Sequence, residues 1–136
     1  MSIRRGYVVR SGEGVDGSHG VKASQTSSGG SMAIIESETD GGAPPHIHHR
    51  EDEAMYVLDG SIVAHVGDEA FEAGPGYFVF MPRDVLHDWD VTSGRARVLL
   101  IAAPGGLDVF LGEFHAAASW DERDAVAERH GLVFPR

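Results

Sequence analysis

Short runs of alternating apolar and polar residues follow one another along most of the chain. Each run is rich in β-branched and aromatic residues and is closed by Gly, Pro or Asp. This spacing is typical of a compact antiparallel β fold, because side chains alternate between the two faces of a strand. The Asp59-Gly60 pair indicates a hairpin between two runs, and Gly67-Asp68 indicates a second turn. The predicted strands span residues 7–10, 32–37, 54–58, 62–66, 69–73, 77–81 and 96–103.

Two segments lack this pattern. Residues 11–30 are rich in Gly and Ser and contain few apolar residues, so we expect a surface loop with at most a short strand around Val21. After residue 106, apolar residues recur at spacings of three and four, which predicts a helix with one apolar face. We interpret this apolar stripe as a core or dimer contact rather than a cofactor site. Its members are Leu107, Phe110, Leu111 and Phe114.

A second helix is predicted near the end of the chain. Ser119 with Glu122 three residues later forms a capping-box pattern, and Gly131 suits the position just after a helix end. We therefore expect a helix over residues 120–130, and we expect residues 132–134 to dock on the strands. Strands followed by helices predict one all-β domain over residues 1–136. Its antiparallel β-barrel would span about residues 1–103, and a short helical C-terminal appendage would span about residues 106–131.

The composition restricts the partners of the chain. The 136 residues fit one domain, and the net charge of −10 disfavours nucleic acid and anionic membranes as partners. No apolar stretch approaches the roughly 20 residues that span a bilayer, and the amino terminus lacks the apolar core of a signal peptide, so we expect a soluble, cytoplasmic protein. Cysteine is absent, so a metal ion would have to be held by nitrogen and oxygen.

Three histidines and one glutamate are spaced so that one metal ion could bind them all. His46 and His48 are separated by one residue, so their side chains project from the same face of an extended segment. A bend could return the carboxylate of Glu53 to the same cavity, and His87 follows a later strand and turn. Such a ligand set suits a divalent transition ion (Fe, Mn, Ni, Co, Cu or Zn) better than Ca or Mg, without identifying which.

These segments resemble the two sequence motifs of the cupin superfamily. The first motif is matched by His46, His48, Glu53 and Gly60, with a leading glycine, Gly41, one residue closer to the histidines than the motif asks. The second motif is matched by Gly76, Pro82 and His87. Two positions of the second motif differ, because Asp84 replaces a glycine and Val91 replaces an asparagine.

Within that superfamily the chain resembles single-domain, quercetinase-like dioxygenases. The resemblance rests on Pro-Pro-His-Ile-His-His at residues 44–49, on Ala-Pro-Gly-Gly-Leu-Asp-Val-Phe at residues 103–110 and on His-Gly-Leu-Val-Phe at residues 130–134. It implies a jelly-roll-like barrel in which the three histidines and Glu53 hold the ion. It further implies that a small phenolic or enolic, flavonol-like substrate is chelated to the ion, that Glu53 takes its proton, and that dioxygen cleaves it.

Alternation along the strands predicts the lining of a substrate pocket. Met55 and Val57 share the face of Glu53, and Trp89 shares the face of His87, which indicates an apolar pocket suited to aromatic molecules. The same lining is expected to include Phe78 and Phe80, although both faces of their strand are apolar.

Other interpretations of the same residues remain open. Each histidine taken singly could be a surface or hydrogen-bonded residue, and Glu51 and Asp52 beside Glu53 could form an acidic surface turn. We expect His49 to face solvent and His65 to be packed or hydrogen-bonded. The chain could also be a non-redox cyclase, isomerase or decarboxylase, or a non-catalytic barrel that binds small molecules. We expect a homodimer, because small barrels often pair their edge strands with a partner.

Overall fold

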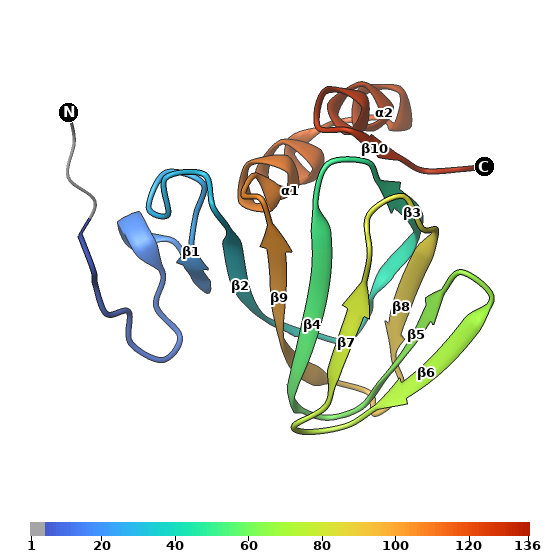
Figure 1. Cartoon of the computed structure of the whole chain (residues 1–136), viewed down its shortest axis with the longest axis horizontal. Helices are drawn as coiled ribbons and strands as arrows, with labels where there is room; N and C mark the ends of the chain where they lie inside the picture. The colour runs from blue at the N-terminus through green and yellow to red at the C-terminus, as the bar shows by residue number, and fades with distance from the viewer. Residues whose placement is uncertain (1–4) are drawn as a thin grey trace.

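Two antiparallel sheets form the body of the molecule in the computed structural model, which describes residues 5–136 (Figure 1). The first sheet has the strand order β1-β2-β9-β4-β7, and the second has the order β10-β3-β8-β5-β6. The strands are β1 Val21–Ala23, β2 Ala33–Thr39, β3 Ala43–His48, β4 Asp52–Asp59, β5 Ile62–Val66, β6 Glu69–Ala73, β7 Phe78–Met81, β8 His87–Val91, β9 Ala96–Ala103 and β10 Leu132–Val133.

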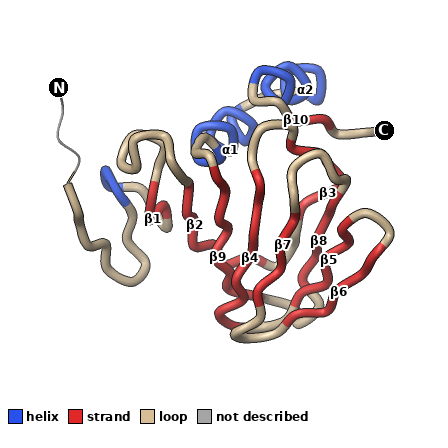
Figure 2. Tube along the Cα trace, in the orientation of Figure 1, coloured by secondary structure: helices blue, strands red, loops and turns tan. Residues whose placement is uncertain are grey.

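Helical structure is confined to a short 3-10 turn, η1 Val15–Gly17, and to two C-terminal helices, α1 Leu107–Ala116 and α2 Trp120–Arg129, within the described part of the chain. Figure 2 shows both helices at one end of the strands. No helix in residues 5–136 is long and apolar enough to cross a membrane. The fold is therefore a jelly-roll-like β-barrel with a helical C-terminal appendage, as the sequence pattern predicts.

Most predicted strands are present, and three of them (β5, β6 and β9) have the predicted bounds. The strand predicted at residues 7–10 was wrong: this segment pairs with no strand, and Val8 is 89% exposed. A strand needs a neighbour for its backbone groups, and β1 already lies beside β2 at that end of the sheet. Conversely, β3 was predicted only conditionally, because its two prolines and irregular pairing hide the strand pattern.

Turn chemistry explains how the chain reverses near the two motifs. Gly60 has φ +78°, and a Cβ there would lie 2.4 Å from the carbonyl oxygen of Arg95, so only glycine fits between β4 and β5. Asp84 has φ +67°. It stands where the second motif has a glycine, and Asp is among the residues that tolerate this conformation. The backbone N–H of Asp84 donates to the carbonyl oxygen of His48 over 2.8 Å, which ties this turn to β3.

The second helix begins and ends as the sequence predicts. The Ser119 hydroxyl accepts a hydrogen bond from the Glu122 N–H over 3.1 Å, while the Glu122 carboxylate accepts from the Ala118 N–H over 2.7 Å. Gly131 follows the helix with φ +76°. The chain then returns to the body as β10, in which Leu132 pairs with His48. The C-terminal tail thus docks beside the strand that carries two of the predicted ligands.

Two apolar clusters hold these layers together. The first fills the space between the sheets and includes Met55, Val57 and Val98, which are fully buried. The second attaches the helices to the first sheet through Leu107 and Phe110. The candidate ligands are buried as well, so the fold surrounds them with a low-dielectric environment. They are His46, His48, Glu53 and His87.

Candidate metal centre

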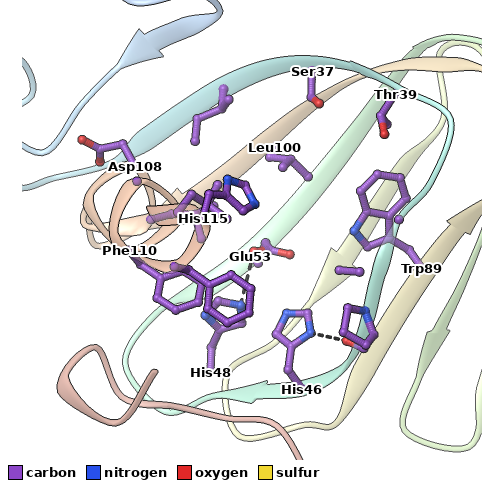
Figure 3. A pocket seen from close by; sticks show the side chains of 18 of the residues that line it. Ser37, Thr39, His46, His48, Glu53, Trp89, Leu100, Asp108, Phe110 and His115 are labelled. Atoms are coloured by element: carbon purple, nitrogen blue, oxygen red, sulfur yellow. Dashed lines mark hydrogen bonds and ion pairs between the residues drawn. The ribbon is translucent and has the colours of Figure 1, made fainter. Parts of the chain in front are cut away.

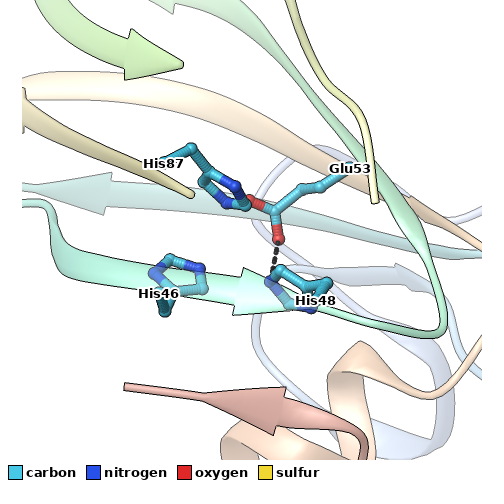
Figure 4. A group of neighbouring side chains, drawn as sticks. All are labelled: His46, His48, Glu53 and His87. Atoms are coloured by element: carbon cyan, nitrogen blue, oxygen red, sulfur yellow. Dashed lines mark ion pairs between the residues drawn. The ribbon is translucent and has the colours of Figure 1, made fainter. Parts of the chain in front are cut away.

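The four predicted ligands converge from three strands. His46 and His48 lie on β3, Glu53 on β4 and His87 on β8, and Figure 4 shows their side chains turned toward one another. One ligand atom from each residue lies within 4.8 Å of the others, and all four residues are buried. His46 and His87 are direct register partners across β3 and β8, which places their rings on the same inner face. The side chains could therefore bind one metal ion.

The outer nitrogen of each imidazole is held by the protein. His46 Nδ1 donates to the Pro44 carbonyl oxygen over 2.7 Å, and His87 Nδ1 donates to the Val85 carbonyl oxygen over 3.2 Å. His48 Nδ1 lies 2.7 Å from a carboxylate oxygen of Glu51. With each Nδ1 engaged as a donor, the Nε2 lone pair is left to face the centre, which is the arrangement that orients metal-binding histidines.

Two of these inner nitrogens are buried without a hydrogen-bond partner, namely Nε2 of His48 and Nε2 of His87. The Glu53 oxygens lie 3.4 and 3.5 Å from them, near enough for electrostatic attraction, but the geometry does not amount to a good hydrogen bond. Buried polar atoms are normally satisfied. An ion at the centre would satisfy both nitrogens and the carboxylate together, so the residues present fit a divalent transition ion.

Burial and mutual charge shift the protonation of the cluster. Burial lowers the pKa of His46 to about 4. Burial also acts to lower the pKa of His48, but the carboxylates of Glu51 and Glu53 outweigh it and raise this pKa to about 9. For Glu53, burial raises the pKa, yet the facing rings of His48 and His87 lower it to about 2. Without metal, the cluster at neutral pH therefore holds a protonated His48 between two carboxylates.

Glu51 is a site residue that the sequence interpretation missed. Its neighbours in sequence suggested an acidic surface turn, but Glu51 is only 3% exposed and pairs with His48. A carboxylate three residues after a ligand histidine was the available signal. Its burial depends on how the turn packs, which the spacing does not reveal.

A cavity of about 520 Å³ opens beside the cluster and is lined by three of the candidate ligands, His46, His48 and Glu53. Figure 3 shows Trp89 at one side of this cavity and Phe110 and His115 of helix α1 at the other, with Glu53 between them. The helical stripe Leu107, Phe110, Leu111 and Phe114 packs in the second apolar cluster as predicted, and it also borders the cavity. Ile35, Leu100 and Phe134 complete this apolar side of the lining. The volume is in the usual range for small-molecule sites.

Only Trp89 among the predicted pocket residues lines this cavity. Met55 and Val57 share the inner face of β4 as expected, but they are fully buried in the core below it. The expectation for Phe78 and Phe80 was wrong, because these side chains are 59% and 52% exposed and are not part of the lining. In β7 the inner face carries Val79 and Met81. Both faces of this strand are apolar, so its sequence does not indicate which face points inward.

The remaining histidines lie outside the cluster. His49 is exposed and lies 2.7 Å from Asp84, and His65 is exposed and lies 2.7 Å from Asp88, in agreement with the sequence expectations. His115, to which the sequence assigned no role, lies at the exposed rim of the cavity.

Comparisons with known proteins agree with this site. A family model described as the cupin domain matches residues 33–102, which is just over half of the chain. Quercetin 2,3-dioxygenase from Bacillus subtilis (strain 168) is 26% identical over 111 residues, covering 76% of this chain but 33% of that protein. The chain thus spans about a third of the length of this curated relative.

Solved structures show the same fold. KdgF from Halomonas sp. aligns with a TM-score of 0.54 and 23% identity, covering 59% of this chain and 74% of that one. The protein TT1209 from Thermus thermophilus aligns with a TM-score of 0.53 and 26% identity, covering 57% and 76%. With the motif residues gathered in one buried cluster and the family model matched over both motifs, the chain belongs to the cupin family.

Proposed function

We propose that this chain is a metal-dependent oxygenase acting on a small phenolic or enolic, flavonol-like molecule. The observation that carries the proposal is the buried cluster of three histidines and Glu53, in which His46, His48 and Glu53 line a cavity with aromatic walls. The similarity to quercetin 2,3-dioxygenase supports the reaction class. His46, His48, His87 and Glu53 would hold the ion, and the ion would be Fe, Mn, Ni, Co, Cu or Zn.

Glu53 is the proposed proton acceptor as well as a ligand. When bound, a divalent transition ion supplies Lewis-acid polarisation that acidifies a phenol or enol, and a redox-active ion also supplies the electron transfer that dioxygen chemistry needs. The low pKa of Glu53 keeps its carboxylate ionised at neutral pH. A carboxylate with so low a pKa is a weak base, so the proposed proton transfer depends on the bound ion acidifying the substrate hydroxyl; the Glu53 side chain is only 6% exposed.

The cavity walls suit a flat aromatic molecule. Trp89 on one side and Phe110 and Phe114 on the other present apolar ring surfaces, and aromatic rings stack or meet edge to face at such surfaces. Apart from the candidate ligands, the polar side chains of the lining are few: Ser37 and Thr39 lie on β2, and Asp108 and His115 lie on α1. An apolar lining with a few polar groups is the common form of a small-molecule site.

Dioxygen consumption tests this function. Protein reconstituted with each candidate ion is supplied with a panel of flavonols and catechols, and uptake is followed with an oxygen electrode while products are identified by mass spectrometry. We expect uptake with at least one ion and substrate. The Glu53→Gln variant, with its metal content measured, should lose at least 100-fold in kcat if Glu53 takes the proton.

The same experiment separates the alternatives. Product formation without oxygen uptake would replace the proposal with a non-redox isomerase, cyclase or decarboxylase. Thermal stabilisation by panel compounds without any product would indicate a barrel that only binds small molecules. Full activity of metal-loaded Glu53→Gln would remove the base role and leave Glu53 as a ligand.

A further inference from the structure

The indole N–H of Trp89 is a hydrogen-bond donor that the fold leaves without a partner. Trp89 lies on β8 and is only 7% exposed. Its Nε1–H makes no hydrogen bond to any of residues 5–136. Buried tryptophan N–H groups usually find a partner, because leaving a buried donor unpaired costs free energy. The packing of the chain alone therefore does not explain why this donor is buried.

The residues paired with Trp89 offer it no side-chain acceptor. Its register partners are Ala43 on β3 and Ala64 on β5. Thr39, another residue of the cavity lining, uses its hydroxyl within its own turn. Its Oγ1 donates to the Gly41 carbonyl oxygen over 2.7 Å and accepts from the Gly41 N–H over 3.1 Å. The donor of Trp89 is thus free to bind a group that enters the cavity.

The N–H group opens into the cavity. In the described part of the chain, the fully covered side-chain nitrogens that lack a partner belong to His48, His87 and Arg123, so Nε1 of Trp89 keeps some accessible surface. Trp89 lines the cavity, and Figure 3 shows its indole nitrogen on the edge of the ring nearer Glu53. Trp89 follows His87 by two residues on β8, so both side chains project from the same face. The donor therefore lies on the cavity wall beside the candidate metal centre.

An indole N–H can donate a hydrogen bond but cannot accept one, which restricts what it can bind. Its complement is an oxygen with a free lone pair, such as a carbonyl oxygen or an ionised hydroxyl oxygen. An aromatic molecule that carries a carbonyl and an adjacent hydroxyl offers both kinds of oxygen. A molecule of the same shape without them would leave the N–H buried and unpaired. Sites that hydrogen-bond a substrate group reject analogues that lack the group for this reason.

We propose that Trp89 determines specificity by donating its indole N–H to a carbonyl or ionised hydroxyl oxygen of the molecule bound in the cavity. The proposal rests on the proposed function in one respect, namely that an oxygen-bearing aromatic molecule enters the cavity. It adds a polar role to the apolar lining that the sequence predicts for Trp89. The ring supplies a stacking surface, and its one polar atom selects the orientation in which a substrate oxygen faces β8.

NMR of the indole N–H signals tests this hydrogen bond directly. The chain has two tryptophans, Trp89 and Trp120, so a ¹⁵N-labelled sample gives two indole signals, and the Trp120→Phe variant assigns them. Zinc-loaded protein is titrated with quercetin under argon, because zinc has no redox chemistry and leaves the probe unreacted. The Trp89 N–H proton should move downfield and exchange more slowly with water. The Trp120 signal should change little, because Trp120 is 45% exposed and lies outside the cavity lining.

Calorimetry measures what the donor contributes to binding. Trp89→Phe removes the N–H and keeps an aromatic ring, so it should raise the dissociation constant of quercetin about 10-fold, the loss expected for one hydrogen bond to a buried acceptor. Trp120→Phe is the matched control and should stay within about twofold of the native chain. Metal content is measured in each sample, so a difference in metal loading cannot be mistaken for a loss of the donor.

Two results would overturn the donor role. One is quercetin bound with an unchanged Trp89 signal, and the other is quercetin bound as tightly by folded, metal-loaded Trp89→Phe as by the native chain. If Trp89→Phe does not fold, the NMR titration of the native chain decides. A shifted Trp89 signal without dioxygen uptake with any candidate ion would remove the proposed oxygenase and keep the donor role. No binding of quercetin to the zinc-loaded native chain would overturn both the donor role and the flavonol-like substrate class.

Discussion

Replacing Glu51 should weaken metal binding although this residue is not a predicted ligand. Its carboxylate lies 2.7 Å from His48 Nδ1, and both side chains are at most 4% exposed. Glu51→Gln keeps an acceptor but loses the charge, and a charge-assisted bond is about twice as strong as a neutral one. Glu51→Met removes the acceptor and keeps a similar volume. We expect the metal dissociation constant to rise about 10-fold and about 100-fold respectively, the range found for groups that orient ligand histidines.

These factors correspond to about 1.4 and 2.7 kcal/mol. Competition between the protein and a chromophoric chelator for Co²⁺ or Zn²⁺ measures them. The titration should be run near pH 9, because Glu51 also helps to raise the pKa of His48 to about 9, and at lower pH its removal would relieve competition from the proton. Thermal unfolding of each metal-free variant shows whether the fold is retained.

Asp84→Asn is the matched control. It alters another histidine–carboxylate pair of 2.7 Å, but the His49 and Asp84 side chains are 51% and 63% exposed, and exposed ion pairs contribute little. Its dissociation constant should stay within about twofold of the native value. If folded Glu51→Met binds as tightly as the native chain, Glu51 does not orient His48 and the reasoning is refuted.

Three further predictions follow from the cluster and the core. Metal binding at pH 7 should release about one proton, because the pKa of about 9 leaves His48 protonated without metal and the ion displaces this proton. Calorimetry in buffers of different ionisation enthalpy measures the release, and a value of zero would contradict the prediction. The free energy of unfolding of metal-free protein should be highest near pH 6.5. The raised pKa of His48 stabilises the fold by about 3 kcal/mol at low pH, and this stabilisation is lost as pH rises toward 9. The lowered pKa of His46 destabilises the fold by about 3 kcal/mol as pH falls from 6.5 toward 4. Denaturant titrations across this pH range should show that maximum, and a flat profile would count against the shifts. Met55→Ala should lower the free energy of unfolding by about 2–5 kcal/mol without changing metal affinity, since Met55 is fully buried in the core. A loss of metal affinity without a loss of stability would show that Met55 belongs to the site and not to the core.

The predictable parts of the structure are those that local patterns determine. The β5–β6 hairpin follows from alternation and from turn residues, and the ligand cluster follows from the spacing of His46, His48, Glu53 and His87. Local patterns also explain Asp84, which replaces the glycine of the motif: aspartate tolerates the positive φ that the turn requires at this position.

The parts that could not be predicted depend on packing between distant segments. The stripe on α1 is visible in the sequence, but nothing local shows that this core contact also borders a cavity. Phe78 and Phe80 lie on a strand with two apolar faces, so only its pairing with β4 shows that they point outward. Residues 7–10 have the composition of a strand but no neighbour to pair with.

A crystal structure of metal-loaded protein, with anomalous difference maps on both sides of the metal absorption edge, tests the central claim most directly. We expect one anomalous peak within about 2.0–2.2 Å of Nε2 of His46, His48 and His87 and of a carboxylate oxygen of Glu53. A fully loaded crystal whose only peaks lie at other residues, or which shows none between these four side chains, would contradict it.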